Sequence, residues 1–170
     1  MGFARDRPET GREWSLRFAA LATTAVLLAQ TLAAQVDPRW FGTWTFNPAK
    51  STGAAEEPFK KGSLTIRPSG EAVQVTYDLF RDRGGVSHLE WTGRFDGRDY
   101  ALQGVDQYSV TNAYRRLDDR TYEIVQKVDG AISATATIRL SPDEKTLTTI
   151  TRGKNALNED VTTTSVYEKR

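Results

Sequence analysis

The side chains that could perform chemistry in this chain are few and scattered. The sequence has one histidine, His88, and no cysteine, so cysteine nucleophiles are excluded and a serine triad would have to use His88. His88 and Glu90 share one face of a predicted strand, which superficially resembles a pair of metal ligands. A catalytic zinc needs three protein ligands, usually including more than one histidine, so we expect no metal site and interpret His88 as an exposed residue.

Pairs of adjacent carboxylates offer a second route to catalysis, through general acid and base chemistry. The pairs are Glu56-Glu57, Asp118-Asp119 and Asp143-Glu144. All three fall in predicted turns or loops, where carboxylates are solvated, whereas a catalytic acid needs an enclosed setting. No glycine-rich phosphate loop follows a strand and opens a helix. We therefore predict no catalytic residue and no cofactor.

The N-terminal stretch has the pattern of a secretory signal peptide. Four arginines precede an apolar run over residues 18–34, which ends in small residues. The run is at the lower limit of the ~17–25 residues that a membrane span needs, and threonine and glutamine interrupt it. We expect residues 1–34 to be a helical signal peptide that is cleaved, with a retained anchor as the alternative. Residues 35–170 would then be one secreted or periplasmic domain without stable membrane insertion.

The charge of residues 35–170 is balanced. The whole chain has 23 basic and 22 acidic residues, and removing the four arginines and three acids of residues 1–34 leaves 19 of each. A surface that binds duplex nucleic acid needs an excess of positive charge to neutralise phosphates. We expect no nucleic-acid partner, and we expect a monomer.

Short alternating segments between regular turns are typical of an all-β domain. Turn signals recur about every 8–12 residues, and Asp96-Gly97 and Asp129-Gly130 are pairs that favour tight hairpins. Between the turns, apolar residues recur at every second position, as side chains do on one face of a strand. Examples of such predicted inner faces are Val73, Val75, Tyr77 and Leu79; Tyr108, Val110 and Tyr114; and Ile132, Ala134, Ala136, Ile138 and Leu140.

Consecutive strands joined by short hairpins make an up-and-down meander, and closing the meander removes exposed sheet edges. We therefore predict an all-β fold, an up-and-down antiparallel β-barrel of about 8–10 strands. A sandwich of two sheets is the alternative, since periodicity alone does not separate the two.

The two ends of this domain resemble known families. Residues 41–44, Phe-Gly-Thr-Trp, resemble the Gly-x-Trp start shared by lipocalins and intracellular fatty-acid-binding proteins. Residues 166–169, Val-Tyr-Glu-Lys, are similar to the last strand of the fatty-acid-binding proteins, and residues 125–130 to one of their hairpins. The chain also resembles small exported bacterial lipocalin-like proteins through residues 42–44, 47–51, 141–148 and 166–169. The resemblance implies a calycin-type barrel around a ligand pocket.

Two departures from the fatty-acid-binding pattern bear on the ligand. A helical lid separates the first two strands in that family, whereas residues 47–62 here are short and broken by prolines and glycine. The family also places an arginine two residues before the final tyrosine, to hold a carboxylate. This chain has Ser165 before Tyr167, so the carboxylate clamp is not carried over.

The resemblance implies an inner lining of mixed polarity, formed by Tyr122, Gln126, Leu147, Thr149, Thr151, Ser165 and Tyr167. We predict ligand contacts from Trp44, Tyr77, Trp91, Tyr108, Tyr122, Gln126, Arg139 and Tyr167. Aromatic residues on alternating strands are often core residues instead, an alternative that applies above all to Trp44. Arg139 and Arg94 are the cations that could meet an anionic head group, although Arg139 lies opposite the apolar face, where an arginine is more often solvated.

These features predict an exported barrel that binds a small apolar or amphipathic molecule. One alternative is a protein-binding or inhibitor-like envelope accessory that acts through residues 47–62 or 153–160. A second alternative, on fold analogy alone, is a cofactor-free enzyme of the isomerase or cyclase type.

Overall fold

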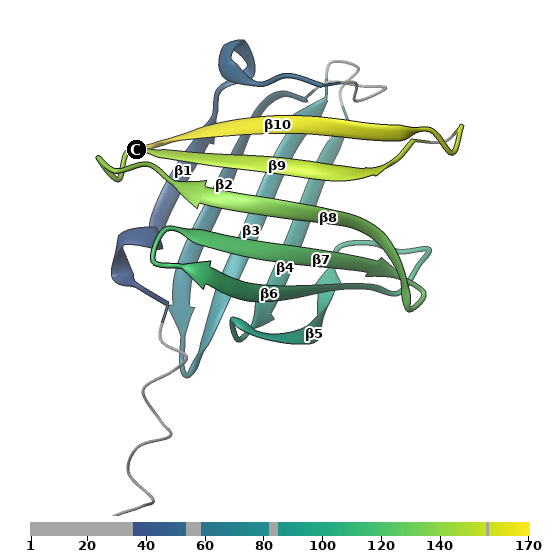
Figure 1. Cartoon of the computed structure of the whole chain (residues 1–170), viewed down its shortest axis with the longest axis horizontal. Helices are drawn as coiled ribbons and strands as arrows, with labels where there is room; N and C mark the ends of the chain where they lie inside the picture. Colours follow the sequence, from purple (N-terminus) through teal and green to yellow (C-terminus); the bar gives the residue numbers. More distant parts are fainter. Residues whose placement is uncertain (1–35, 54–58, 82–84, 156) are drawn as a thin grey trace, which may run out of the picture. The chain divides into compact units, whose positions relative to one another are not determined.

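The computed structural model describes residues 36–53, 59–81, 85–155 and 157–170, and its strands close into a barrel (Figure 1). Each strand pairs antiparallel with its neighbours in chain order, and β1 pairs with β10 to complete the ring. The predicted all-β, up-and-down barrel is thus confirmed, with ten strands. These are β1 (Gly42–Phe46), β2 (Phe59–Ser69), β3 (Ala72–Arg81), β4 (Val86–Gly93), β5 (Asp96–Gln103), β6 (Val110–Asp118), β7 (Thr121–Val128), β8 (Ala131–Leu140), β9 (Thr146–Lys154) and β10 (Asp160–Lys169).

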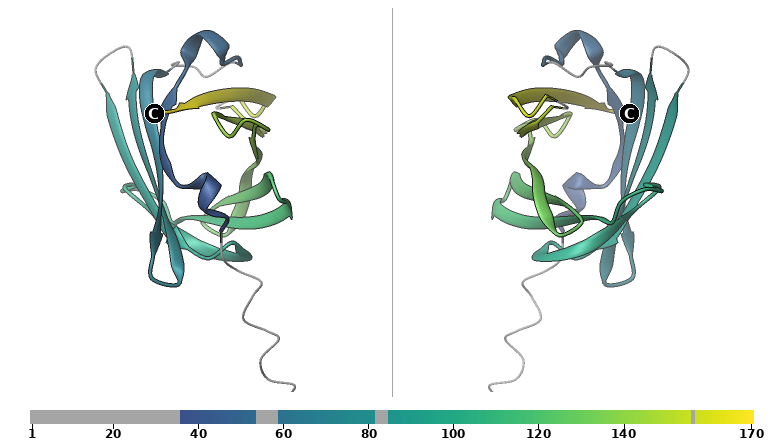
Figure 2. Two further views of the ribbon diagram at one scale, coloured as in Figure 1. Left: turned by 90° about the vertical axis from the view of Figure 1, so that its left-hand side faces the viewer. Right: turned by 90° about the vertical axis from the view of Figure 1, so that its right-hand side faces the viewer.

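The barrel has two crossing walls. Strands β2 to β4 run steeply across the view of Figure 1, whereas β6 to β10 run almost horizontally, and Figure 2 shows the two walls from the side. A short 3-10 helix, η1 (Pro38–Trp40), precedes β1, and a second, η2 (Pro48–Lys50), follows it. We call the end of the barrel at which β1 begins the η1 end. The predicted signal peptide and the Glu56-Glu57 pair lie outside the described residues, and within those residues no helix has the length and hydropathy of a membrane span.

The two-residue period correctly identifies the inner face of most strands. Val73, Val75 and Leu79 of β3 are buried, as are Ile138 and Leu140 of β8. Successive side chains of a strand point to opposite faces of the sheet, so every second side chain points into the barrel. The apolar side chains of both walls therefore share one interior.

Ile132 is an exception to the predicted inner face of β8. Gln126 of β7 pairs with Ala134, but the next residue, Lys127, pairs with Ile132, so Ser133 is an extra residue on β8. Such a bulge shifts the strand by one position and reverses which face each side chain meets. Ile132 is accordingly 67% exposed instead of buried.

Aromatic rings fill the half of the interior next to η1. Trp40 of η1 packs edge-on against Tyr122, with ring centroids 4.9 Å apart. Phe95 lies 4.6 Å from Tyr122 and 4.8 Å from Tyr114, and Tyr114 lies 4.4 Å from Trp91. Contacts at these distances and tilts add to the free energy gained by burying the rings. This half of the barrel is therefore solid.

Indole hydrogen bonds fix the orientation of two buried tryptophan rings, Trp44 and Trp91. Trp44 Nε1 donates to the Trp40 carbonyl oxygen at 3.1 Å, which ties β1 to η1. Trp91 Nε1 donates to the Asn112 carbonyl oxygen at 3.0 Å, which ties β4 to β6. Both Trp44 and Trp91 are fully buried, so an unpaired indole N–H at either position would cost free energy.

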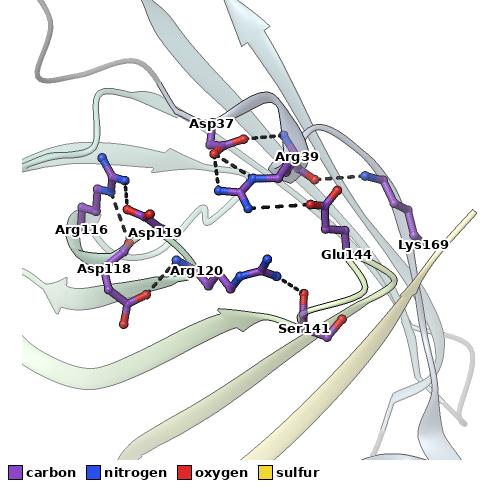
Figure 3. Close-up of polar contacts among 9 residues, drawn as sticks. All are labelled: Asp37, Arg39, Arg116, Asp118, Asp119, Arg120, Ser141, Glu144 and Lys169. Carbon is purple, nitrogen blue, oxygen red and sulfur yellow. Dashed lines mark hydrogen bonds and ion pairs between the residues drawn. The ribbon is translucent and has the colours of Figure 1, made fainter.

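Polar contacts hold η1 over its end of the barrel (Figure 3). Asp37 caps η1: its carboxylate accepts from the Arg39 backbone N–H at 3.0 Å and from Arg39 Nε at 2.8 Å. Arg39 also lies 3.7 Å from the carboxylate of Glu144. Lys169, on the last strand, donates to the Arg39 carbonyl oxygen at 3.0 Å. The chain before β1 is thereby attached to the β8–β9 turn and to β10.

Gly104, at the start of the β5–β6 loop, lies close to the backbone of β4. Gly104 has φ +89°, and a Cβ there would lie 2.1 Å from the backbone oxygen of His88. Gly97 also has positive φ, +78°, but nothing lies within 4 Å of its missing Cβ. Alanine pays a backbone cost at both positions, but it meets a backbone clash only at Gly104.

We predict that Gly104→Ala destabilises the barrel much more than Gly97→Ala. The left-handed backbone costs an alanine about 1–2 kcal/mol at either site, and the displaced β4 carbonyl adds further cost at Gly104 alone. Urea unfolding of both variants measures the difference in unfolding free energy. Equal losses would contradict the close approach.

We also predict a pH dependence from the η1 contacts. The hydrogen bonds from Arg39 lower the pKa of Asp37 from 3.8 to about 2. A carboxyl with a lowered pKa stabilises the fold above its ordinary pKa, and that stabilisation is lost as the pH falls toward 2. The loss of stability caused by Asp37→Asn should therefore be largest near neutral pH and should shrink between pH 4 and pH 2.

The midpoint of urea unfolding, measured for both proteins at each pH, tests this. Asp106→Asn, in an exposed loop, is the matched control. A difference between Asp37→Asn and the parent that does not change with pH would contradict the prediction.

Candidate functional site

The interior is hollow in the half away from η1. A partly open cavity of about 420 Å³ lies there. Its described lining consists of Leu64, Tyr77, Leu79, Leu89, Leu102, Asn112, Ile124, Gln126, Ala134, Thr135, Ala136, Thr149, Thr151, Ser165 and Tyr167.

One side of the cavity is a leucine wall, formed by Leu64, Leu79, Leu89 and Leu102. These side chains come one each from β2, β3, β4 and β5. Leu64 is 1% exposed, and Leu79 and Leu102 are both buried. This side can offer only apolar contact to a bound molecule.

The opposite side carries hydroxyl and amide groups from β6 to β10. Gln126 Nε2 donates to Asn112 Oδ1 at 3.4 Å, and Ser133 Oγ donates to Gln126 Oε1 at the same distance. Threonine and serine side chains continue this polar wall along the last strands, at Thr149, Thr151 and Ser165. Small alanines lie between them, at Ala134 and Ala136. Their short side chains leave the volume unfilled.

Tyrosine hydroxyls form the floor of the cavity. The hydroxyls of Tyr77 and Tyr114 are 2.9 Å apart and share a hydrogen bond. Tyr77 and Tyr167 line the cavity, whereas Tyr114 lies beneath Tyr77, beside a space of only about 10 Å³ that reaches Trp40. We call Tyr77, Tyr114 and Tyr167 the tyrosine floor.

Burial makes these hydroxyls harder to ionise than an exposed tyrosine. It raises the pKa of Tyr114 to about 12 and the pKa of Tyr77 well above its ordinary value of 10. Burial raises the pKa of Tyr167 as well, and the neighbouring Tyr77 raises it further. At physiological pH the floor therefore presents neutral O–H groups, which both donate and accept hydrogen bonds.

The structure separates the predicted ligand contacts into three groups. Tyr77, Gln126 and Tyr167 line the cavity. Trp44, Trp91 and Tyr122 are buried in the solid half, where they pack among other aromatic rings or donate to the backbone. The remaining two, Tyr108 and Arg139, do not line the cavity.

Tyr108 and Arg139 lie on the outside for different reasons. Tyr108 precedes the first residue of β6, so the alternation does not extend to it, and its side chain is 57% exposed. Arg139 lies between the buried Ile138 and Leu140 and faces outward, where its Nε donates to Thr121 Oγ1 at 3.4 Å. Arg94, the other arginine considered for an anionic head group, pairs with Glu71 on the surface.

Those residues considered for catalysis that the structure describes lie outside the interior. His88 is exposed, with its Nδ1 2.7 Å from Asp78 Oδ1. Backbone and side-chain hydrogen bonds lower the pKa of Asp118 and of Asp143, so both stay ionised and are unsuited to act as acids. Among the described residues, no three potential ligands gather as a metal ion would require.

Asn112 lines the cavity but was not among the predicted ligand contacts, although its place in the sequence points to the interior. Asn112 lies between Val110 and Tyr114, two positions from each, and is 5% exposed. An amide on an otherwise apolar inner face indicates a polar contact inside the barrel. The sequence does not distinguish the four leucines of the leucine wall in this way, since leucine at an inward position is typical of any packed core.

The segment between β1 and β2 contains no α-helix in its described part. It forms η2, after which Ser51 Oγ accepts from the Val166 backbone N–H at 3.0 Å and Thr52 forms a bridge with Thr164. The predicted absence of a helical lid holds for residues 47–53 and 59–62, and residues 54–58 lie outside the description.

Comparison with known proteins gives a likeness of backbone only. No protein-family model and no curated protein matches the sequence. Among solved structures, the chain is similar to zebrafish ileal bile acid-binding protein complexed with cholic acid. The identity is 13%, over 78% of this chain and 99% of that chain, and the TM-score is 0.49. The barrel itself is confirmed. The resemblance to calycins and to exported bacterial proteins stays a prediction.

The tyrosine floor predicts that the barrel loses stability in alkali. A group whose pKa is raised by folding stabilises the fold below its ordinary pKa, here about 10, and this stabilisation is lost as the pH rises further. Unfolding midpoints in urea should therefore fall steeply above pH 10, and Tyr114→Phe should make that fall shallower. Tyr108→Phe, on the exposed loop, is the control and should keep the parent's slope. Identical slopes for all three proteins would contradict the prediction.

Proposed function

We propose that this protein is an exported barrel that binds a small apolar or amphipathic molecule in its cavity. The observation that supports the proposal is the partly open cavity of about 420 Å³ between the leucine wall and the polar wall. Small-molecule sites are typically concave, of ~300–1,000 Å³, mostly apolar and equipped with a few placed polar groups. Export is inferred from the basic and apolar pattern of residues 1–34.

The direct test is native mass spectrometry of the protein purified from its own source, with extraction of any molecule that co-purifies. A bound species at one per barrel supports the proposal and gives its chemistry. The same preparation reports whether residues 1–34 have been removed and whether the protein is a monomer.

We predict that filling the cavity weakens binding without unfolding the barrel. Ala136→Leu adds a branched side chain to the cavity lining, whereas Ala101→Leu adds the same group to the exposed face of β5. The neutral dye N-phenyl-1-naphthylamine, which fluoresces in apolar surroundings, should bind the parent and Ala101→Leu alike. Ala136→Leu should weaken its binding about tenfold or more, which corresponds to about 1.4 kcal/mol.

Circular dichroism shows whether each variant keeps its β structure. Equal binding by Ala136→Leu and the parent would place the dye outside the cavity and contradict the proposal.

A protein-binding role through the loops is the second candidate, and exposed apolar side chains favour it. Val86, Tyr108, Ile132 and Leu157 are between 57% and 75% exposed, and all lie toward the strand ends opposite the η1 end. Exposed apolar groups that gather at one end can mark an interaction surface. If no small molecule co-purifies with the protein, this second candidate is favoured over small-molecule binding.

A further inference from the structure

The cavity has many polar groups in its described lining but no charged one. Asparagine, glutamine, threonine, serine and tyrosine supply the polar side chains of this described lining. The arginines that could have served an anionic ligand, Arg94 and Arg139, lie on the outer surface. An anion that entered the cavity would lose its hydration and would find no opposite charge among the described side chains, which is unfavourable.

The interior already disfavours anions of its own. Burial raises the pKa values of Tyr77, Tyr114 and Tyr167, because the phenolate form is poorly solvated there. The carboxylate of a bound acid would meet the same poorly solvating surroundings. Protonation of such a ligand would be favoured for the same reason as protonation of the tyrosines.

The tyrosine floor can donate a hydrogen bond into the cavity. Tyr77 and Tyr114 share one hydrogen bond, and when Tyr114 donates it, the hydroxyl proton of Tyr77 has no acceptor among the described residues. Tyr77 and Tyr167 both reach the cavity surface, with Ser165 on the same wall. An uncharged oxygen of a hydroxyl, ester or ketone group can accept a hydrogen bond from this floor.

From these observations, and resting on the proposed binding function, we propose that the cavity selects uncharged amphiphiles and rejects their anions. The oxygen of the ligand binds at the hydroxyls of Tyr77 and Tyr167, and its apolar body packs against the leucine wall. A carboxylic acid binds in its protonated form only.

Two probes with the same chain length test this selectivity: decan-1-ol and decanoic acid. Each is titrated against the full domain by displacement of N-phenyl-1-naphthylamine at pH 5, 6 and 7. We expect the affinity for decan-1-ol to stay constant. The apparent affinity for decanoic acid should fall about 100-fold between pH 5 and pH 7, because a carboxyl with a pKa of about 4.3 loses its neutral form tenfold per pH unit.

The outcomes separate the two proposals. An affinity for decanoic acid that does not change with pH would show that the anion binds, and it would overturn the selectivity while leaving the binding function intact. Absence of binding by either probe, in a protein that also fails to bind the dye, would overturn the binding function and the selectivity with it.

A designed cation provides an independent test. Ser165→Arg places a guanidinium on the cavity side of β10, whereas Thr162→Arg places the same group on the exposed side of that strand. Ser165→Arg should raise the affinity for decanoate at pH 7 at least tenfold over the parent, and Thr162→Arg should not. Should Ser165→Arg fail to fold, Thr151→Arg on β9 serves the same purpose. Tight decanoate binding by the parent, unchanged by the added cation, would overturn the proposal.

The floor itself is tested by removing its hydroxyls. Tyr77→Phe and Tyr167→Phe keep the rings but remove the hydrogen-bonding oxygens, so each should weaken decan-1-ol binding severalfold. Tyr122→Phe, in the solid half of the barrel, should leave it unchanged. Equal affinities in all three variants would overturn the placement of the ligand's oxygen.

Discussion

Closure of the sheet forces every second side chain of ten strands into one shared interior. How that interior is filled depends on side-chain size, since the backbone treats all positions alike. Near η1 the inward positions carry Trp44, Trp91, Tyr114 and Tyr122, and Trp40 is added from η1 itself, so the rings pack without a usable space. Farther from η1, β8 to β10 place alanine, threonine and serine at inward positions, and these side chains cannot reach the far wall. The cavity is the consequence of that uneven distribution.

The same distribution gives the cavity two chemically different sides. The leucine wall comes from β2 to β5 and the polar wall from β6 to β10. Strands β2 to β4 and β6 to β10 are the two crossing walls of the barrel in Figures 1 and 2. The polar groups on the second wall are tolerated because they bond to one another, as Gln126 does with Asn112 and Ser133, or reach the cavity surface. The interior is therefore polar enough to orient a molecule while remaining too poorly solvating for a charge.

Sequence periodicity predicted the barrel but could not predict which parts of it are hollow. Alternation identified Val73, Val75 and Leu140 as inward because a strand has a fixed period of two. It failed at Ile132, since the extra residue Ser133 lies within an otherwise regular pattern. It also failed at Tyr108, since the alternating pattern begins two residues before β6 itself does. The separation of Tyr77 and Tyr167, which line the cavity, from Trp44 and Trp91, which do not, depends on packing across the barrel between strands distant in sequence. No local pattern encodes that packing.

The ring closes between strands at opposite ends of the barrel's chain. Trp44, Thr45 and Phe46 of β1 pair with Lys169, Glu168 and Tyr167 of β10. During synthesis, which proceeds from the N-terminus, β1 leaves the ribosome first and its partner last. Both edges of the growing sheet, and the leucines between them, thus stay open to other molecules until the final strand arrives. Unpaired strand edges can template association with other chains, and this barrel removes its last free edges only when β10 pairs with β1.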